Sequence, residues 1–412
     1  MESKNNLKSK YRIALIVAAV APVPDVLGGG AERLVTMLID ENEIQNQIDL
    51  VVFSLYNDTA KGIADKYKNT QIFYLKTGNI FDKCYNLGVR ILKKMFPKLN
   101  ILKHGYYRNI AKIIKDMNLD FAIDENGYVP ELFYIQQIIG KENLSAHIHW
   151  DVNPVFANID NLYGSIIGVS NYITSSWKNN SCDNNLIGKT VYSAVDRTRF
   201  LKKLNENEKM SLRKQWRIND DDIVLIYCGR MAKQKGIKEL IQAFNNLSYD
   251  NVKLLLVGGE NLKNEERSKF YNELLSMPEA DNNSIIFTGY VENTSLYQFY
   301  QISDIQVIPT IVEEAAGLVA IEGMLSGLPL IVTDSGGLVE YISKECALIV
   351  SRKNLIFNLT TAMKKLIEDK ELRNQMSIAS VNRSMLFQQE KYYNSFLDSV
   401  STIIKKTKKK GI

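Results

Sequence analysis

The 412-residue sequence lacks paired cysteines and long apolar runs, and these absences exclude several classes of protein. Its four cysteines are scattered, with no C-x-x-C pair, which argues against a disulfide scaffold or a zinc site and suits a reducing compartment. No apolar run approaches the roughly 20 residues that a membrane-spanning helix needs. The composition, with 45% hydrophobic and 24% charged residues, is that of a globular protein, and the length predicts two domains.

The N-terminal segment KNNLKSKYRIALIVAAVAPVP allows two interpretations. Basic residues, an apolar stretch and small residues are typical of a secretory signal. The same segment is also a short apolar strand that leads into the glycine-rich turn GGGAER and an apolar-periodic helix, LVTMLI. Because a strand accounts for the turn and the helix after it and a signal does not, we expect a strand.

The net charge of +5 is unevenly distributed. Between Asp82 and Asp116 there is no acidic residue, and the region Lys83–Lys115 interleaves lysines and arginines with aromatic and aliphatic residues. The chain also ends in the basic tail IIKKTKKKGI. Such a pattern suits the surface of an anionic membrane or a plain solvated face. No nucleic-acid module accompanies it, so we expect no nucleic-acid partner.

Short apolar segments alternate with helical segments in two series. The expected strands are residues 13–20, 50–54, 121–124, 146–149 and 166–170, then 223–228, 253–257, 284–288, 305–308 and 329–333. Most of them do not alternate between apolar and polar residues, as is typical of parallel strands buried on both faces. The α/β order predicts two doubly wound, Rossmann-like domains. We place these domains at 1–190 and 191–385, followed by a C-terminal helix and basic tail at 386–412 that could pack on either domain.

Glycine-rich or polar loops follow the expected strands, where open parallel sheets bind their ligands. In the loop GRMAKQKG, Arg230 and Lys235 precede an amphipathic helix. Two cations at a helix N-terminus make a site for a diphosphate, since arginine binds it as a planar fork and lysine as a point charge. A solvated basic turn is the alternative.

The segment EEAAGLVAIEGMLSGLPLIVTDSGG places two acids eight positions apart. Gly317, Leu318 and Val319 are expected to begin a helix, and their free amides could bind phosphate oxygens. Glu322, further along this helix, could accept hydrogen bonds from the hydroxyls of a ribose. Glu314 precedes the turn and lies nearer to any group beyond the phosphates. A catalytic acid/base pair and an ordinary acidic helix N-terminus are the alternatives.

These motifs resemble the second half of a family 4 glycosyltransferase with the GT-B fold, in which two Rossmann-like domains face a central cleft. The resemblance runs through VSNYITSSW, VDRTRF, GRMAKQKGIKELIQAF, LLLVGG, FTGYV, SDIQVIPT and the glutamate pair, over most of residues 165 to 345. The form EAAG is nearer to the lipopolysaccharide-core and capsular polysaccharide enzymes than to the commoner EGFG form. In the first half, GGGAER resembles the glycine-rich loop that faces the diphosphate, and HIHWD resembles the segment of the active-site histidine.

The resemblance implies a role for each of these residues. The diphosphate would contact Arg230, Lys235 and the helix of the glutamate segment, with the ribose on Glu322. Glu314 would hold hydroxyls of the donor sugar, and His149 would contact that sugar near the reacting bond. The resemblance also assigns three glycines to donor binding: Gly29 and Gly30 in the segment GGGAER, and Gly258 in the segment LLLVGG.

The implied activity is the transfer of a hexose, with retention, from a nucleotide-sugar that we expect to be UDP-linked. The implied acceptor is a glycan, lipid-linked, of a bacterial surface polysaccharide. We expect no metal and no cofactor, and a cytoplasmic enzyme that can lie on the inner face of the membrane. Double displacement through Glu314 stays open. The alternatives are a catalytically silent subunit that serves as a binding partner or chaperone, and an epimerase or phosphorylase of the same fold.

Overall fold

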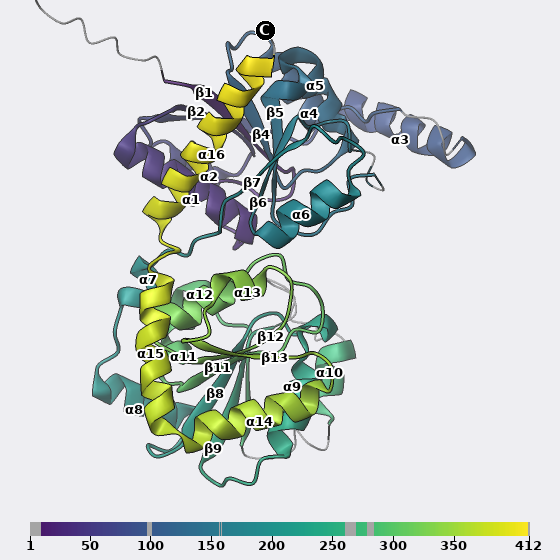
Figure 1. Cartoon of the computed structure of the whole chain (residues 1–412). Coiled ribbons are helices and arrows are strands. Elements are labelled where there is room, and N and C mark those ends of the chain that lie inside the picture. Colours follow the sequence, from purple (N-terminus) through teal and green to yellow (C-terminus); the bar gives the residue numbers. More distant parts are fainter. Residues whose placement is uncertain are drawn as a thin grey trace, which may run out of the picture. The chain divides into compact units, whose positions relative to one another are not determined.

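The computed structural model describes residues 10–96, 101–155, 157, 159–259, 269–277 and 284–410 (Figure 1). The chain divides into two compact units. Unit 1 comprises Met1–Val191 and Tyr392–Ile412, and unit 2 comprises Tyr192–Lys391. The end of the chain, which the sequence allowed on either domain, therefore belongs to unit 1. Among the described helices, none combines the length and apolarity that crossing a bilayer requires.

Unit 1 is built on a seven-stranded parallel sheet of order β3-β2-β1-β4-β5-β6-β7. Its strands are β1 (Arg12–Val17), β2 (Asp49–Leu55), β3 (Thr70–Leu75), β4 (Phe121–Glu125), β5 (Leu144–Ile148), β6 (Ser165–Gly168) and β7 (Ile187–Thr190). Its helices are α1 (Gly30–Gln45), α2 (Asp58–Ala64), α3 (Ile80–Met95), α4 (Tyr106–Ile114), α5 (Phe133–Ile139), α6 (Asn171–Asn180) and, from Tyr392 on, α16 (Gln389–Lys410). The strand order reverses between β1 and β4, which is where such sheets bind ligands.

Helix α16 is anchored on unit 1 along much of its length. The Tyr393 hydroxyl donates a hydrogen bond of 2.7 Å to Asn42 Oδ1 in α1. Further along, Lys408 pairs with Asp120 at 3.4 Å. Between these contacts, Phe396 lies fully buried. The helix is thus part of the hydrophobic core of unit 1.

Unit 2 is built on a six-stranded parallel sheet of order β10-β9-β8-β11-β12-β13. Its strands are β8 (Ile223–Cys228), β9 (Val252–Val257), β10 (Ile285–Gly289), β11 (Ile305–Ile308), β12 (Leu330–Thr333) and β13 (Ala347–Val350). Its helices are α7 (Thr198–Leu201), α8 (Glu206–Gln215), α9 (Ile237–Asn245), α10 (Lys269–Leu275), α11 (Leu296–Gln301), α12 (Leu318–Leu325), α13 (Leu338–Tyr341), α14 (Leu355–Glu368) and α15 (Lys370–Ser384).

Both faces of the unit 2 sheet are covered, which explains the uninterrupted apolar strands. Leu225 and Tyr227 of β8 pack in one core with α9 and α14. Val224 and Ile226, which point the other way, pack in a second core with α11 and α12. Alternate residues of one strand therefore enter two different cores, and both must be apolar. The prediction of two parallel, Rossmann-like sheets is confirmed.

Three strands were missed from the sequence, and all three lie at sheet edges: β3, β7 and β13. An edge strand has a neighbour on only one side, so its side chains are less completely buried. Every described residue of β7, for example, is only partly buried. The apolar signal that marks a central strand is accordingly weak in these segments.

Candidate functional site

The strands of unit 2 lead into loops that carry most of the residues predicted to bind a donor. Four of these loops follow β9, β8, β11 and β12, which are consecutive neighbours in the sheet. Because all the strands are parallel, the four loops meet at the same edge. Hydrogen bonds between the loops then hold them in place.

The loops after β8 and β9 are in direct backbone contact. The amide of Gly229 donates to the carbonyl of Val257 at 3.0 Å, and the amide of Met231 donates to that of Gly259 at 3.0 Å. Gly258 has a φ of 138°, and a Cβ atom there would lie 2.0 Å from the carbonyl oxygen of Gly229. Only glycine fits this position. The packing of two loops therefore explains this residue, and its predicted contact with a donor stays a prediction.

The loop after β8 is also fastened to the loop after β11. Gly236 has a φ of 70°, and a Cβ there would lie 1.9 Å from the Pro309 carbonyl oxygen. The amide of Ile311 donates to the Gln234 carbonyl at 3.0 Å. This close approach carries Lys235, the residue between Gln234 and Gly236, to the β11 loop.

Lys235 and Glu314, predicted separately from the sequence, are brought together by these contacts. Lys235 Nζ lies 2.5 Å from Glu314 Oε1, and the Thr310 hydroxyl donates to the same oxygen at 2.9 Å. Both side chains stay partly exposed. Glu314 Oε2 has no hydrogen-bond partner among the described residues. One oxygen of the carboxylate is therefore held inside the protein while the other can accept from a ligand.

The segment DSGG after β12, Asp334–Gly337, clamps the backbone of this acidic loop. The Ser335 hydroxyl accepts from the Glu314 amide at 2.9 Å and donates to the Val312 carbonyl at 2.6 Å. The amide of Gly337 donates to the Glu314 carbonyl at 2.7 Å. The backbone on both sides of the Glu314 side chain is thus fixed, which orients the carboxylate.

Arg352, which follows the missed strand β13, ties the same two loops together by charge. Its guanidinium contacts Glu313 Oε1 at 2.6 Å and Asp334 Oδ1 at 3.2 Å. Sequence reasoning did not single out this arginine. The signal that could have found it was the apolar run ALIV, which ends two residues before it and indicates a further strand that ends at the same sheet edge.

Helix α12 begins where the sequence predicted, with Gly317 as its N-cap and Leu318 as its first residue. The amides of Leu318 and Val319 have no acceptor among the described residues. Free amides at a helix N-terminus, together with the helix dipole, favour an anion. This end of α12 comes three residues after Glu314, whose backbone carbonyl accepts from the amide of Gly337.

Glu322 lies in the second turn of α12 and is buried. Its Oε2 accepts a hydrogen bond of 3.0 Å from the Tyr300 hydroxyl. Burial and the nearby Glu322 carboxylate raise the pKa of Cys228 to about 12. The structure therefore places this acid among the buried residues of unit 2, and its predicted contact with a ribose stays a prediction.

Arg230 is exposed in the loop after β8. Its side chain makes no hydrogen bond or ion pair with the rest of the described chain, whereas its carbonyl accepts from the Tyr227 hydroxyl at 2.8 Å. A cation held by its backbone but not by a carboxylate is available to a ligand. The two predicted cations thus differ in their ion pairing, because Lys235 has a carboxylate partner and Arg230 has none in the described chain.

In unit 1, the glycine-rich loop before α1 is already occupied by carboxylates. Asp25 Oδ1 accepts from the amides of Gly28 and Gly29 at 2.7 and 3.2 Å. The Glu32 side chain folds against Gly29, where a Cβ would lie 1.9 Å from its Oε2, and Gly30 is the first residue of α1. Asp25 is also paired with Arg33 at 3.4 Å. The predicted contact of Gly29 and Gly30 with a diphosphate stays a prediction. Sequence reasoning missed Glu32.

A second cluster of unit 1 joins Glu125, the last residue of β4, to two histidines. His147 Nδ1 lies 3.0 Å and His149 Nε2 lies 2.9 Å from Glu125 Oε2. The Tyr128 hydroxyl accepts from the His149 amide at 2.9 Å. The sequence placed both histidines on one face of a strand, and their ring centroids are 4.3 Å apart. It did not reveal Glu125, which comes from the neighbouring strand.

The electrostatics of this cluster follow from its burial. Burial alone would raise the pKa of Glu125, but the two imidazoles lower it to about 2. Burial and the neighbouring His147 lower the pKa of His149 below its usual 6.5. The carboxylate is therefore ionised and His149 is neutral at neutral pH.

The same three residues offer the donor atoms of a metal site, since their ligand atoms lie within 4.8 Å of one another. Hydrogen bonds from both rings to a single carboxylate account for the arrangement without an ion. Each ring also has a second nitrogen, His147 Nε2 and His149 Nδ1, that is buried without a hydrogen-bond partner in the described chain. The bond from His149 Nε2 to Glu125 fixes the orientation of the His149 ring.

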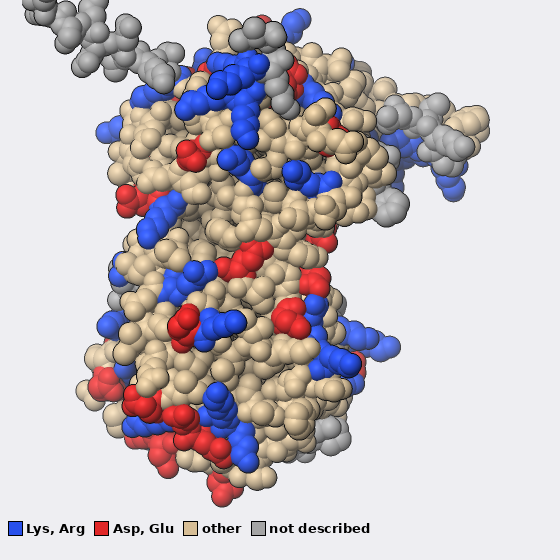
Figure 2. Space-filling view, in the orientation of Figure 1, with Lys and Arg blue, Asp and Glu red and all other residues tan. Residues whose placement is uncertain are grey.

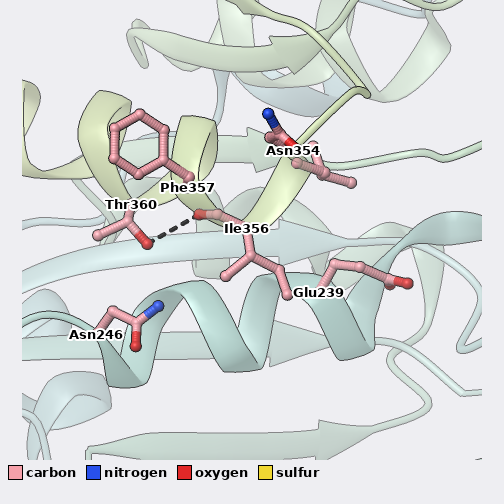
Figure 3. Close-up of a pocket in the computed structure, with 7 residues that line it drawn as sticks. Glu239, Asn246, Asn354, Ile356, Phe357 and Thr360 are labelled. Atoms are coloured by element: carbon pink, nitrogen blue, oxygen red, sulfur yellow. Dashed lines mark hydrogen bonds between the residues drawn. The ribbon is translucent and has the colours of Figure 1, made fainter.

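A surface pocket lies between α9 and α14 (Figure 3). Its lining includes Glu239, Asn246, Asn354, Ile356, Phe357 and Thr360. The Thr360 hydroxyl donates to the Ile356 carbonyl within α14 at 2.9 Å. The lining contains none of the residues predicted to bind the donor, so we do not assign the pocket to that site.

Comparison with known proteins relates the second unit to one family. A family model described as Glycosyl transferases group 1 matches residues 208–383. An uncharacterised glycosyltransferase of Methanocaldococcus jannaschii is 32% identical over 158 residues, which are 38% of this chain and 39% of that protein. Lipopolysaccharide 1,2-N-acetylglucosaminetransferase of Salmonella typhimurium is 32% identical over 139 residues, 33% of this chain and 36% of that protein. The aligned segments thus cover less than half of each relative.

Solved structures match over nearly the whole chain. A glycosyltransferase from Rickettsia africae has a TM-score of 0.72 at 18% identity and covers 96% of this chain and 99% of its own. The Anabaena protein HepE in complex with UDP-glucose has a TM-score of 0.72 at 16% identity and covers 95% of this chain and 100% of its own. At these identities the likeness establishes the fold alone.

Proposed function

We propose that this chain, which has the GT-B fold and matches the glycosyl transferases group 1 model over residues 208–383, is a retaining hexosyltransferase of that family. Its donor is a UDP-sugar and its acceptor is a lipid-linked glycan of a bacterial surface polysaccharide. The observation that carries the proposal is the pairing of Lys235 with Glu314 beside the N-terminus of α12. The UDP-glucose complex of a structure with the same fold and a lipopolysaccharide enzyme among the relatives support the substrate classes.

In this proposal the leaving diphosphate is stabilised by unit 2. Arg230, Lys235 and the free amides of α12 carry the positive charge that a departing UDP requires. Such groups lower the barrier because they are oriented before the charge develops. They supply this charge without a metal ion, and the site needs no cofactor.

The transfer step follows from the placement of these charges. The acceptor hydroxyl oxygen bonds to the anomeric carbon while the bond from that carbon to the diphosphate oxygen breaks. The electron pair leaves with UDP, and the hydroxyl proton passes to the departing phosphate oxygen. Attack on the face from which UDP leaves preserves the configuration at this carbon.

Glu314 and His149 are proposed to contact the transferred sugar. Glu314 Oε2, which is free of partners in the described chain, accepts from sugar hydroxyls. His149 is a neutral imidazole whose orientation is set by Glu125. We assign Glu125 the role of a positioning residue, because it touches the histidine and not the reacting atoms.

The positioning role predicts a shift in the pH profile. Since the pKa of His149 is lowered, its neutral form persists below pH 6.5, and the acid limb of kcat/KM should lie below that pH. Glu125→Gln removes the negative charge that favours the imidazolium, so the limb should move to still lower pH. The lost charge-assisted hydrogen bond should also reduce kcat about ten- to a hundredfold. The pH dependence of initial rates measures both effects.

The control for this variant is Glu142→Gln, an exposed acid in the turn that precedes β5. It should leave the profile unchanged. A purely structural role for Glu125 would lower the yield or stability of the protein without moving the acid limb. That result would show that Glu125 does not position His149 for the reaction.

The proposed function is tested by nucleotide release from UDP-, GDP-, dTDP- and ADP-sugars, with and without a membrane extract. We expect release from one donor, raised by the extract, insensitive to chelator and lost in Arg230→Ala and Glu314→Ala. Binding of a nucleotide without any release would favour a silent subunit, and a partner chain should then co-purify. Conversion of the nucleotide-sugar without release would favour an epimerase, and release that depends on phosphate would favour a phosphorylase.

A further inference from the structure

Helix α3 exposes an apolar face to solvent. Six of its large apolar side chains are each between 40% and 84% exposed. They are Ile80, Phe81, Leu87, Ile91, Leu92 and Met95. The spacing is that of one helical face, three to four residues apart. Soluble proteins rarely leave an apolar surface of this extent uncovered, so the face is expected to have a binding partner.

The opposite side of α3 attaches the helix to unit 1. A capping box between Asn79 and Asp82 fixes its first turn. The Asn86 side chain exchanges two hydrogen bonds with the backbone of His104, and Tyr85 stacks on the His104 ring with centroids 3.6 Å apart. Val89 is buried. These contacts leave the helix with its apolar face turned away from the protein.

The charges of α3 are almost all positive. Its cations are Lys83, Arg90, Lys93 and Lys94, and its single acid, Asp82, is buried in the capping box. At about 100° per residue, three of the cations fall along one border of the apolar face. Figure 2 shows α3 projecting from unit 1 with blue side chains along one edge and tan surface beside them. The partner of this face is therefore apolar at its centre and anionic at its border.

We propose that α3 lies in the interface of a bilayer that contains anionic phospholipid. A helix with aliphatic and aromatic residues on one face and lysines beside them binds in the plane of such an interface. The apolar side chains would enter the acyl-chain boundary, and the cations would meet the phosphates. With 16 residues, the helix is about 24 Å long and lies on the membrane rather than across it.

The structure assigns the membrane-binding surface to a smaller part of the chain than the basic region identified in the sequence. The predicted region Lys83–Lys115 also contains α4, whose Tyr106 and Ile110 are buried in unit 1. The basic residues of α4 therefore surround a helix of the core, and Lys98 lies outside the described residues. Among the described residues of this region, the exposed apolar face is that of α3. This inference does not depend on the transferase function.

Vesicle flotation tests the proposal. The full chain should float with vesicles of phosphatidylcholine and phosphatidylglycerol, and less with phosphatidylcholine alone. Replacing Phe81 or Ile91 by Glu should weaken partition into the vesicles about tenfold or more, because each change removes one apolar side chain that the bilayer would bury. Ile378→Glu is the matched control, since Ile378 lies on α15 of unit 2 with an exposure between those of Phe81 and Ile91, and it should leave partition unchanged.

A probe on Cys84 gives a direct readout of insertion. Cys84 is exposed on α3, and the other exposed cysteine, Cys182, is replaced by serine before labelling. An environment-sensitive fluorophore on Cys84 should shift to the blue with anionic vesicles, and less so at high salt. No flotation, or no shift, would overturn the proposal. The proposal would also be overturned if the protein formed a dimer that Phe81→Glu dissociates and did not bind vesicles. A second copy of the chain would then cover the apolar face.

Discussion

The variant Lys235→Ala is expected to lower kcat/KM for sugar transfer about a hundred- to a thousandfold. Removing one oriented donor from a developing negative charge typically has an effect of this size. Lys235 is held at 2.5 Å from Glu314 and is only partly exposed, so its charge is less screened than that of a surface lysine. The loss should appear mainly in kcat, because the charge on the diphosphate grows as its bond to the sugar breaks. Steady-state kinetics with the identified donor measures it.

Lys233→Ala is the matched control for this prediction. Lys233 lies in the same 3-10 turn as Lys235 and is exposed. If both variants lose activity equally, the basic turn acts through general attraction of the anionic donor, and the specific role of Lys235 is wrong. A loss confined to Lys235→Ala supports it.

The variant Glu314→Gln is expected to lower kcat about a hundredfold or more while the protein stays folded. Glutamine retains the size of the side chain and an acceptor for the Thr310 hydroxyl. It loses the charge that holds Lys235, and it loses one of the oxygens that can accept from sugar hydroxyls. The contact to Lys235 and the contact to the sugar hydroxyls are thus weakened at once, and the loss of each should lower kcat roughly tenfold or more. Single-turnover kinetics and thermal unfolding separate the loss of chemistry from a loss of structure.

The neighbouring acid provides the control for Glu314. Glu313 points to Arg352 at the surface, and Glu313→Gln should change kcat by less than about threefold, because an exposed ion pair contributes little. The double variant Lys235→Ala, Glu314→Ala should lose much less than the product of the two single losses, since each side chain acts through the other. Additive losses would show that the two residues act independently.

The same glutamate distinguishes two chemical routes. In front-side transfer, Glu314 only binds hydroxyls, and Glu314→Ala stays inactive when azide is added. In double displacement, Glu314 is a nucleophile, and azide can attack the anomeric carbon in its place and release an azido sugar. We expect no rescue. Formation of the azido sugar would replace the front-side route with a covalent one.

Part of the candidate site could be predicted because it lies in short segments directly after strands. Arg230, Lys235, Glu314 and the start of α12 were identified from loops between an apolar run and a helix. In parallel sheets such loops must meet at one edge, so their residue types alone indicated the chemistry. The predicted meeting of the loops is confirmed by the bonds between the β8, β9, β11 and β12 segments.

Other parts of the site were invisible because they depend on neighbours that are distant in the sequence. Glu125 reaches His149 only because β4 pairs with β5, and Arg352 reaches Asp334 only because β13 pairs with β12. Glu32 turns back onto Gly29 rather than outward from α1. No local pattern reveals which strands become neighbours or which way a side chain turns.

The sequence by itself determined the class of fold, two parallel sheets, because strands buried on both faces must be apolar throughout and must alternate with helices. It also determined which loops carry charge and glycine. Only the tertiary structure decided that Lys235 pairs with Glu314, that Glu322 is buried against Tyr300, that α16 belongs to unit 1 and that α3 turns its apolar face to solvent. The reason is physical: periodicity shows that a helix has an apolar face, whereas the packing of the whole chain decides whether anything covers it.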